Sequence, residues 1–162
     1  MYQESTNGKK KFTKQQGQSK AEHFCAYQER CQQEVRDKLY NWGLYPNEVE
    51  EIIADLISAN FLNEERFAMA YVSGKFNIKG WGKVKIKQGL KQKRISPRLI
   101  NDALKTINTD SYTEKLFYLI EKKAISLQEK DPFKRKAKLA QYALGKGYES
   151  DLIFDLLKNN NL

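Results

Sequence analysis

The chain repeats one pattern of apolar residues three times along its length. When Pro46 is aligned with Pro97, an offset of 51 residues, the apolar positions on both sides coincide without a gap, and a further offset of 53 brings in a third copy. Self-similarity at a fixed period of this size is the signature of a repeat protein. The aligned sets are Val35, Ile86 and Leu139; Leu39, Leu90 and Ala143; Leu44, Ile95 and Tyr148; Val49, Ile100 and Ile153; Ile53, Leu104 and Leu157.

Each copy is predicted to contain two helices joined by a short turn. In the first copy, Gly43 follows one apolar helical stretch, and Pro46 opens a second stretch whose apolar residues recur every three or four positions. In the second copy, Ser96 is placed to cap the helix that follows it. In the third, Gly147 ends one helix and the next begins near Ser150.

A further amphipathic stretch precedes each pair, so each repeat is expected to have three helices. No strand signal competes with this reading, because no Asn-Gly or Asp-Gly turn separates alternating segments. The predicted fold is all-α: three tandem three-helix, helix-turn-helix-like repeats that stack into an elongated molecule, since one unit cannot bury its apolar face alone. The expected parts are a disordered basic tail over 1–19 and repeats over 20–62, 63–108 and 109–162.

Charge is distributed unevenly along the chain. The net charge is +9, yet residues 66–101 alone contain ten Lys or Arg and no Asp or Glu. Such a field attracts polyanions or an acidic protein surface. The alternative is a basic face that only keeps the protein soluble, but solubility does not require the exclusion of every carboxylate from 36 residues.

Signals for catalysis, cofactors and membranes are missing from the sequence. His23, Cys25 and Cys31 lack the spacing of a zinc site, and no glycine-rich nucleotide loop is present. The longest apolar run, 67–72, is far shorter than the ~18 residues of a membrane span. We therefore predict a protein that is not an enzyme and has no cofactor or metal. Two cysteines form no disulfide framework, which favours the cytoplasm.

A stripe of cations is predicted beside the apolar face of the second repeat. At about 100° per residue, Lys83, Lys87, Lys91 and Arg94 fall within an arc of roughly 80°. Arg98, Asn101 and Lys105 share one face of the predicted helix over 97–107 and could contact bases or phosphates. The candidate residues for binding a partner or nucleic acid are Lys79, Trp81, Lys83, Lys85, Lys87, Lys91, Lys93, Arg94 and Arg98.

Trp81 has two interpretations. It stands between two glycines and among lysines, so an exposed ring could stack on a base or anchor an interface. Alternatively, the glycines make a tight turn and the ring packs beneath the next helix. The second is favoured, because large aromatic side chains are usually mostly buried.

Three sequence blocks resemble the RecX regulators of bacterial recombination, over about residues 24–157. The blocks are R-C-Q-Q-E-V-R-D-K-L at 30–39; F-L-N-E-E-R-F-A at 61–68 with Tyr71 and Val72, followed by G-W-G-K at 80–83 with Ile86 and Leu90; and G-Y-E-S-D-L-I at 147–153. Cys31 stands where many members have serine, which removes a helix cap, and the N-terminal tail does not align.

The resemblance implies three tandem three-helix repeats and a regulatory function. RecX-like proteins bind the RecA filament on single-stranded DNA and interfere with its ATP turnover, strand exchange and co-protease role; the family has no catalytic residues to carry over. We expect a monomer without membrane attachment. Two other functions remain open from the residues: a direct DNA-binding protein whose second helix enters the major groove, and a scaffold that binds an acidic partner.

The repeat pattern predicts an extended monomer. In solution scattering, the radius of gyration should lie well above the roughly 15 Å of a compact domain of this length. A radius near that value, together with clear strand content in circular dichroism, would contradict the repeat prediction.

Overall fold

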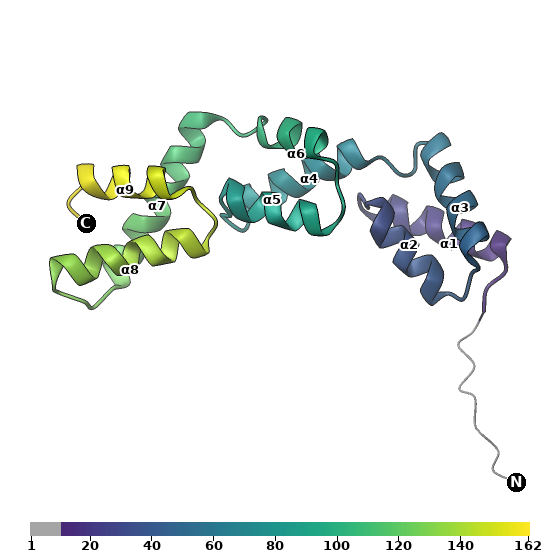
Figure 1. Cartoon of the computed structure of the whole chain (residues 1–162), viewed down its shortest axis with the longest axis horizontal. Helices are drawn as coiled ribbons and strands as arrows, with labels where there is room; N and C mark the ends of the chain where they lie inside the picture. Colours follow the sequence, from purple (N-terminus) through teal and green to yellow (C-terminus); the bar gives the residue numbers. More distant parts are fainter. Residues whose placement is uncertain (1–10) are drawn as a thin grey trace, which may run out of the picture. The chain divides into compact units, whose positions relative to one another are not determined.

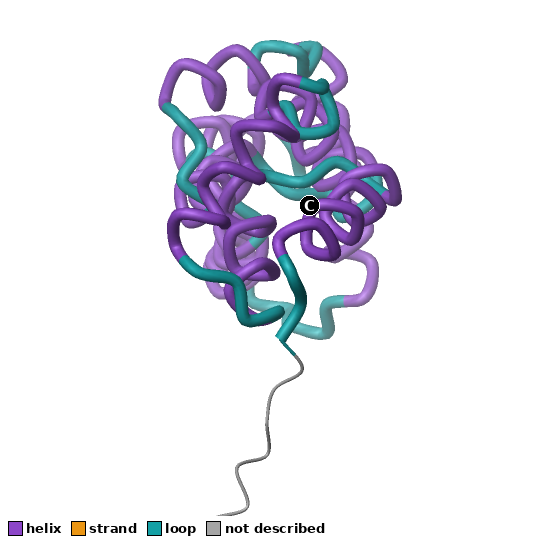
Figure 2. Tube along the Cα trace, turned by 90° about the vertical axis from the view of Figure 1, so that its right-hand side faces the viewer, coloured by secondary structure: helices purple, strands orange, loops and turns teal. Residues whose placement is uncertain are grey.

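The computed structural model describes residues 11–162, and within that range the chain forms α-helices and loops without strands (Figures 1 and 2). It divides into two compact units, one through Phe67 and one from Ala68. The predicted all-α class with successive three-helix repeats is confirmed. The helices are α1 (Lys14–Tyr27), α2 (Gln32–Asn41) and α3 (Pro46–Ser58); α4 (Glu64–Asn77), α5 (Lys83–Gln92) and α6 (Pro97–Leu104); α7 (Thr109–Ser126), α8 (Pro132–Gly145) and α9 (Ser150–Asn159).

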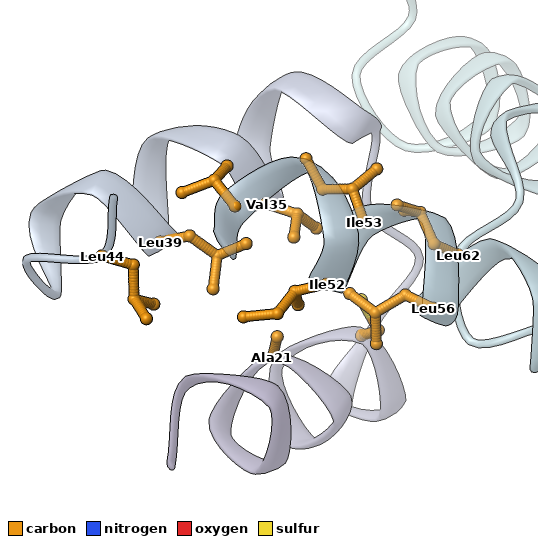
Figure 3. Close-up of a cluster of buried hydrophobic side chains, with 10 residues drawn as sticks. Ala21, Val35, Leu39, Leu44, Ile52, Ile53, Leu56 and Leu62 are labelled. Carbon is orange, nitrogen blue, oxygen red and sulfur yellow. The ribbon is translucent and has the colours of Figure 1, made fainter. Parts of the chain in front are cut away.

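Helices α1, α2 and α3 enclose the core of the first repeat. Ala21 of α1, Leu39 of α2 and Ile52 of α3 converge at its centre and are fully buried (Figure 3). Their spacing along each helix follows the helical period, so each helix presents one apolar face inward. The cluster comprises Ala21, Cys25, Val35, Leu39, Leu44, Val49, Ile52, Ile53, Leu56 and Leu62.

The first helix begins earlier than the sequence predicted. α1 starts at Lys14, so the prediction of disorder is wrong for residues 14–19. A capping box accounts for the early start: the Thr13 hydroxyl accepts a bond from the Gln16 N–H at 3.2 Å, and the Gln16 side chain accepts one from the Thr13 N–H at 3.0 Å. These two bonds satisfy amide donors that the first turn of a helix otherwise leaves unpaired.

The residue before the capping box is also held in place. Phe12 packs edge-on against Trp42, and its N–H donates to the Trp42 carbonyl at 3.0 Å. An aromatic pair of this kind adds about 0.5–1.5 kcal/mol beyond the area it buries. The part of the predicted tail over residues 1–10 lies outside the described residues.

One kind of turn ends the second helix of every repeat. After α2, the Leu44 N–H donates to the Leu39 carbonyl at 3.2 Å, and the Gly43 N–H donates to the Tyr40 carbonyl at 3.0 Å. This pair of bonds is a Schellman motif, which requires a left-handed residue just after the helix. Gly43 takes that conformation with a φ of +83°.

The second and third repeats use the same turn. Ile95 bonds to Leu90 at 3.1 Å, and Tyr148 bonds to Ala143 at 3.3 Å. The left-handed residue is Gly147 in the third repeat, with a φ of +94°, but Arg94 in the second, with a φ of +60°. A side chain in the left-handed region costs roughly 1–2 kcal/mol. At this turn, the second repeat therefore carries strain that the other two avoid.

The apolar positions that align across the repeats form the cores. All of those named in the second and third copies are buried except Leu104, which is half-buried. Tyr148 fills in the third repeat the place that Leu44 and Ile95 fill in the others. The register read from the sequence thus identifies the core at nearly every position.

The first turn of α4 belongs to the first unit and makes polar contacts within it. Cys31 precedes α2 and its side chain makes no capping bond. Instead, the Glu64 carboxylate accepts a bond from the Gln32 N–H at 3.1 Å. Burial raises the pKa of Glu64, and that bond opposes the shift. Arg66 donates to Glu29 at 2.9 Å.

The turn comparison predicts opposite effects for two reciprocal substitutions. Arg94→Gly should raise the free energy of unfolding by about 0.5–1 kcal/mol, because glycine adopts the left-handed region without a steric penalty. Gly43→Ala should lower it by about 1 kcal/mol or more for the converse reason. Chemical denaturation of both variants is the measurement. Destabilisation by Arg94→Gly would show that Arg94 contacts outweigh the strain.

Candidate functional site: a basic surface on the second repeat

The structure separates the nine predicted binding residues into an exposed group and a half-buried group. The exposed cations lie on the α4–α5 turn, on α5 and the turn after it, and at the start of α6; they are Lys79, Lys87, Lys91, Arg94 and Arg98. The half-buried residues are Trp81, Lys83, Lys85 and Lys93. The exposed group forms a basic surface that faces solvent. The half-buried group lies along one side of it, which we call the inner edge.

The Gly-Trp-Gly turn between α4 and α5 docks on the turn between α8 and α9. The Gly82 N–H donates to the Lys146 carbonyl at 2.8 Å, and the Val84 N–H donates to the Gly147 carbonyl at 2.9 Å. The Tyr148 hydroxyl donates to the Gly80 carbonyl at 3.1 Å in a buried environment. Two segments far apart in the sequence thus share a layer of backbone hydrogen bonds.

Glycine is required on both sides of this contact. A Cβ on Gly82 would lie 2.3 Å from the Gly147 carbonyl oxygen, and one on Gly147 would lie 2.2 Å from the Lys85 Cβ. Gly80 has a φ of +68°, which turns the chain after α4. The predicted tight turn is therefore correct, and its second glycine also serves the close approach of two backbones.

Lys83 does not belong to the exposed stripe in which the helical period placed it. Its backbone N–H donates to the Tyr112 hydroxyl at 3.0 Å, and its ammonium lies 4.7 Å from the centre of the Tyr112 ring. The Tyr112 hydroxyl in turn donates to Glu149 at 2.8 Å. Burial raises the pKa of Tyr112, and the bonded carboxylate raises it further, so the hydroxyl stays a donor. Lys83 is a packing residue at the junction of the repeats.

Trp81 is half-buried, which lies between the exposed ring and the enclosed ring of its two interpretations. Its backbone N–H donates to the Lys75 carbonyl at 2.9 Å. Two ammonium groups face the ring: Lys75 at 4.6 Å and Lys85 at 4.5 Å from its centre. Cations over an indole ring are held by its quadrupole. Trp81 therefore organises cations at the inner edge of the basic surface.

Two lysines of the third repeat join this edge, and sequence reasoning missed both. The Lys115 ammonium donates to the Asn77 carbonyl at 3.3 Å, and the Lys146 ammonium donates to the Lys79 carbonyl at 2.9 Å. Burial lowers the pKa of Lys146, and the charges of Lys85, Lys115 and Lys79 lower it further. These lysines lie in a nearly neutral part of the sequence. They come close to the cations of the second repeat only because the two turns pack against each other.

Arg94 occupies the strained turn position at the end of the stripe. Its equivalents in the other repeats are glycines, as the geometry of the turn prefers. Backbone strain in folded proteins is concentrated at functional sites, where the surroundings hold it in place. The strain at Arg94 thus supports a role for its side chain at this surface.

The described residues show no centre for metal chemistry. No group of His, Cys, Asp and Glu in residues 11–162 is arranged to hold a metal ion. His23 is exposed, whereas both cysteines are buried and form no disulfide with each other; burial raises the pKa of the Cys25 thiol to about 11. In the same range, no helix is long and apolar enough to cross a membrane.

Comparison with known proteins gives matches over all three repeats. The models of the first, second and third three-helix domains of RecX match residues 19–56, 63–104 and 110–157. A regulatory protein RecX of Clostridium perfringens (strain 13 / Type A) is 33% identical over 124 residues, 75% of this chain and 58% of the relative. That of Clostridium acetobutylicum is 33% identical over 144 residues, 86% and 66% of the two chains. This chain spans about half to two-thirds of the relatives' length.

Two solved structures have a similar fold. The crystal structure of RecX from Lactobacillus salivarius aligns with a TM-score of 0.81 and 29% identity, over 90% of this chain and 95% of the other. A crystal structure of a regulatory protein RecX aligns with a TM-score of 0.79 over 91% of this chain and 74% of the other. At 24% identity, the second shows the fold alone.

The backbone contact at Gly82 predicts a large effect of one added methyl group. Gly82→Ala should lower the free energy of unfolding by about 1–3 kcal/mol, because the Cβ meets backbone that cannot move aside. Gly74→Ala is the matched control: it lies inside α4, and its Cβ would meet nothing within 4 Å. The control should be neutral or stabilising by up to about 1 kcal/mol. Thermal and chemical denaturation compare the two, and equal effects would contradict the docking argument.

Proposed function

Because the chain belongs to the RecX family, we propose that it is a regulatory protein that binds the RecA filament on single-stranded DNA and inhibits its recombinase, ATPase and co-protease activities. The curated relatives are regulatory proteins by name. The proposed regulator catalyses no reaction itself and acts as a monomer in the cytoplasm. Its two buried cysteines form no disulfide with each other, which is compatible with a reducing compartment.

The observation that carries the proposal is the excess positive charge of the second repeat. Ten cations and no carboxylate occur over residues 66–101, and the exposed ones named above lie on α5, α6 and the turns beside them. A nucleoprotein filament presents DNA phosphates and acidic protein groups together. A cationic surface is attracted to both, which speeds encounter and opposes dissociation.

A second candidate is a direct DNA-binding function of helix-turn-helix type. The observation that favours it is the position of Arg98, Asn101 and Lys105 on and just after α6, the helix that follows the turn, where all three side chains are exposed. In such proteins the second helix of the pair enters the major groove and its side chains read base edges. A preference for one duplex sequence over others would support this candidate against the filament proposal.

Reversing charge on the basic surface should strongly weaken inhibition of RecA. The variant carries Lys87→Glu, Lys91→Glu and Arg98→Glu, whose side chains are all exposed, and it leaves Lys83 on Tyr112. Exposed substitutions of this kind change stability by about 0.5 kcal/mol or less each, so the fold should survive. With wild-type protein at stoichiometric ratios, ATP hydrolysis by RecA on single-stranded DNA should slow; with the variant, the concentration for half-inhibition should rise roughly tenfold or more.

A matched triple variant separates a local surface from net charge. Lys122→Glu, Lys130→Glu and Lys134→Glu change the same charge at exposed positions of the third repeat. This variant should inhibit RecA nearly as well as the wild type. If both triples weaken inhibition equally, the basic surface is not the contact and only overall charge matters. If the wild type leaves RecA unaffected, the proposed function is wrong.

A further inference from the structure

We propose that the junction of the second and third repeats is a binding site for a backbone phosphate of single-stranded nucleic acid, formed around Trp81 by Lys79, Lys85, Lys115 and Lys146. The site lies at the inner edge of the basic surface and belongs to both repeats. The inference rests on the proposed function for the presence of single-stranded DNA, but its chemistry is testable with DNA alone.

The four lysines converge from four separate segments. Lys79 lies on the α4–α5 turn and Lys85 on α5, whereas Lys115 comes from α7 and Lys146 follows α8. The Lys115 and Lys146 ammonium groups each donate to a backbone carbonyl, at 3.3 and 2.9 Å. A carbonyl is a neutral acceptor, and an ammonium has three N–H donors. These bonds position both cations and leave their charge and further donors available to an anion.

The positive charge at this junction is not neutralised within the described chain. None of the four lysines forms an ion pair in residues 11–162. The carboxylate nearest in sequence to Lys146, Glu149, accepts its bond from Tyr112. The charged groups that lower the pKa of Lys146 are all lysines, so the cations repel one another. A bound anion removes that repulsion.

Trp81 distinguishes a nucleic acid from an acidic protein surface. A carboxylate side chain would pair with the lysines but has no ring to stack on the indole. In a nucleotide, the phosphate lies one sugar away from a base, and base–aromatic stacking contributes about 1–3 kcal/mol. The Lys75 and Lys85 ammonium groups that face the half-buried ring are flexible side chains that a phosphate can draw away. Single strands suit the site, because their bases are free to stack.

The test uses Trp81 as its own reporter. In a Trp42→Phe background it is the one remaining tryptophan of the chain. Titration with a short oligo-dT at low salt should change Trp81 emission. Lys79→Gln with Lys146→Gln should weaken oligo-dT binding roughly tenfold and flatten the slope of log affinity against log salt by about 0.7 for each phosphate that the variant no longer binds. The matched control, Lys134→Gln with Lys136→Gln, removes the same charge from exposed positions of α8 and should change little.

Further measurements keep the result interpretable. Circular dichroism and unfolding midpoints of the two double variants should match, since the Gln side chains retain hydrogen-bond donors for the carbonyls. Anisotropy of labelled oligo-dT with the full chain and both tryptophans repeats the comparison without the Trp42→Phe change. Inorganic phosphate and poly-glutamate are titrated in parallel. Inorganic phosphate should compete weakly, and poly-glutamate should leave Trp81 emission unchanged.

Several outcomes would overturn the site. One is that Trp81 emission does not respond to oligo-dT, and another is that both double variants lose affinity equally. The others are that the protein binds inorganic phosphate but not oligo-dT, and that poly-glutamate changes Trp81 emission as much as oligo-dT does. RecA is absent from this assay, so its result is independent of RecA inhibition. Intact inhibition with no oligo-dT binding would remove the phosphate site and leave the proposed function standing. Site-specific oligo-dT binding without RecA inhibition would do the reverse.

Discussion

The backbone of Gly82 lies against the backbone of Gly147, and the arrangement of the second unit depends on that contact. It aligns the Gly82 and Val84 amides with carbonyls of the α8–α9 turn. It also places the Tyr148 hydroxyl on the Gly80 carbonyl. Buried backbone donors left without such partners would each cost about 1–3 kcal/mol. The same contact brings lysines of the third repeat to the cations of the second, so the packing that joins the repeats also builds the candidate site.

The three repeats share one turn but use it differently. Gly43 and Gly147 adopt the left-handed conformation without strain, whereas Arg94 adopts it with a side chain. Gly147 is constrained twice, by its φ and by its contact with Lys85. In the second repeat a long cation takes the place of the glycine. The same turn therefore packs against the α4–α5 turn in the third repeat and contributes a cation to the basic surface in the second.

The sequence predicts the cores well because the apolar period and the turn residues specify the same register. Val35, Ile86 and Leu139 are all fully buried, as their alignment requires. It predicts less well where the determining contact is distant. The capping box at Thr13 is a local signal that could have moved the start of α1. Lys146, by contrast, reaches the site only through bonds to the distant α4–α5 turn, and no local pattern carries that information. Lys83 fits the helical stripe by period, yet Tyr112 draws it out of the stripe.

The distribution of charge gives the two units different electrostatic roles. In the first unit, three of the cations have acidic partners: Arg36 binds Glu50, Arg66 binds Glu29, and Lys14 binds Glu51. Because these pairs are at least partly exposed to solvent, each adds little stability. Acidic residues outnumber basic ones over residues 21–65, so this part of the chain has no excess of positive charge. Over residues 66–101 the second repeat has no carboxylate to offset its positive charge. Its cations repel one another in the free protein. Burial lowers the pKa of the neighbouring Lys146, and repulsion from Lys85, Lys115 and Lys79 lowers it further. For a polyanion that binds there, attraction to the lysines is joined by the relief of their mutual repulsion, so the absence of acidic residues favours binding in addition to the presence of basic ones.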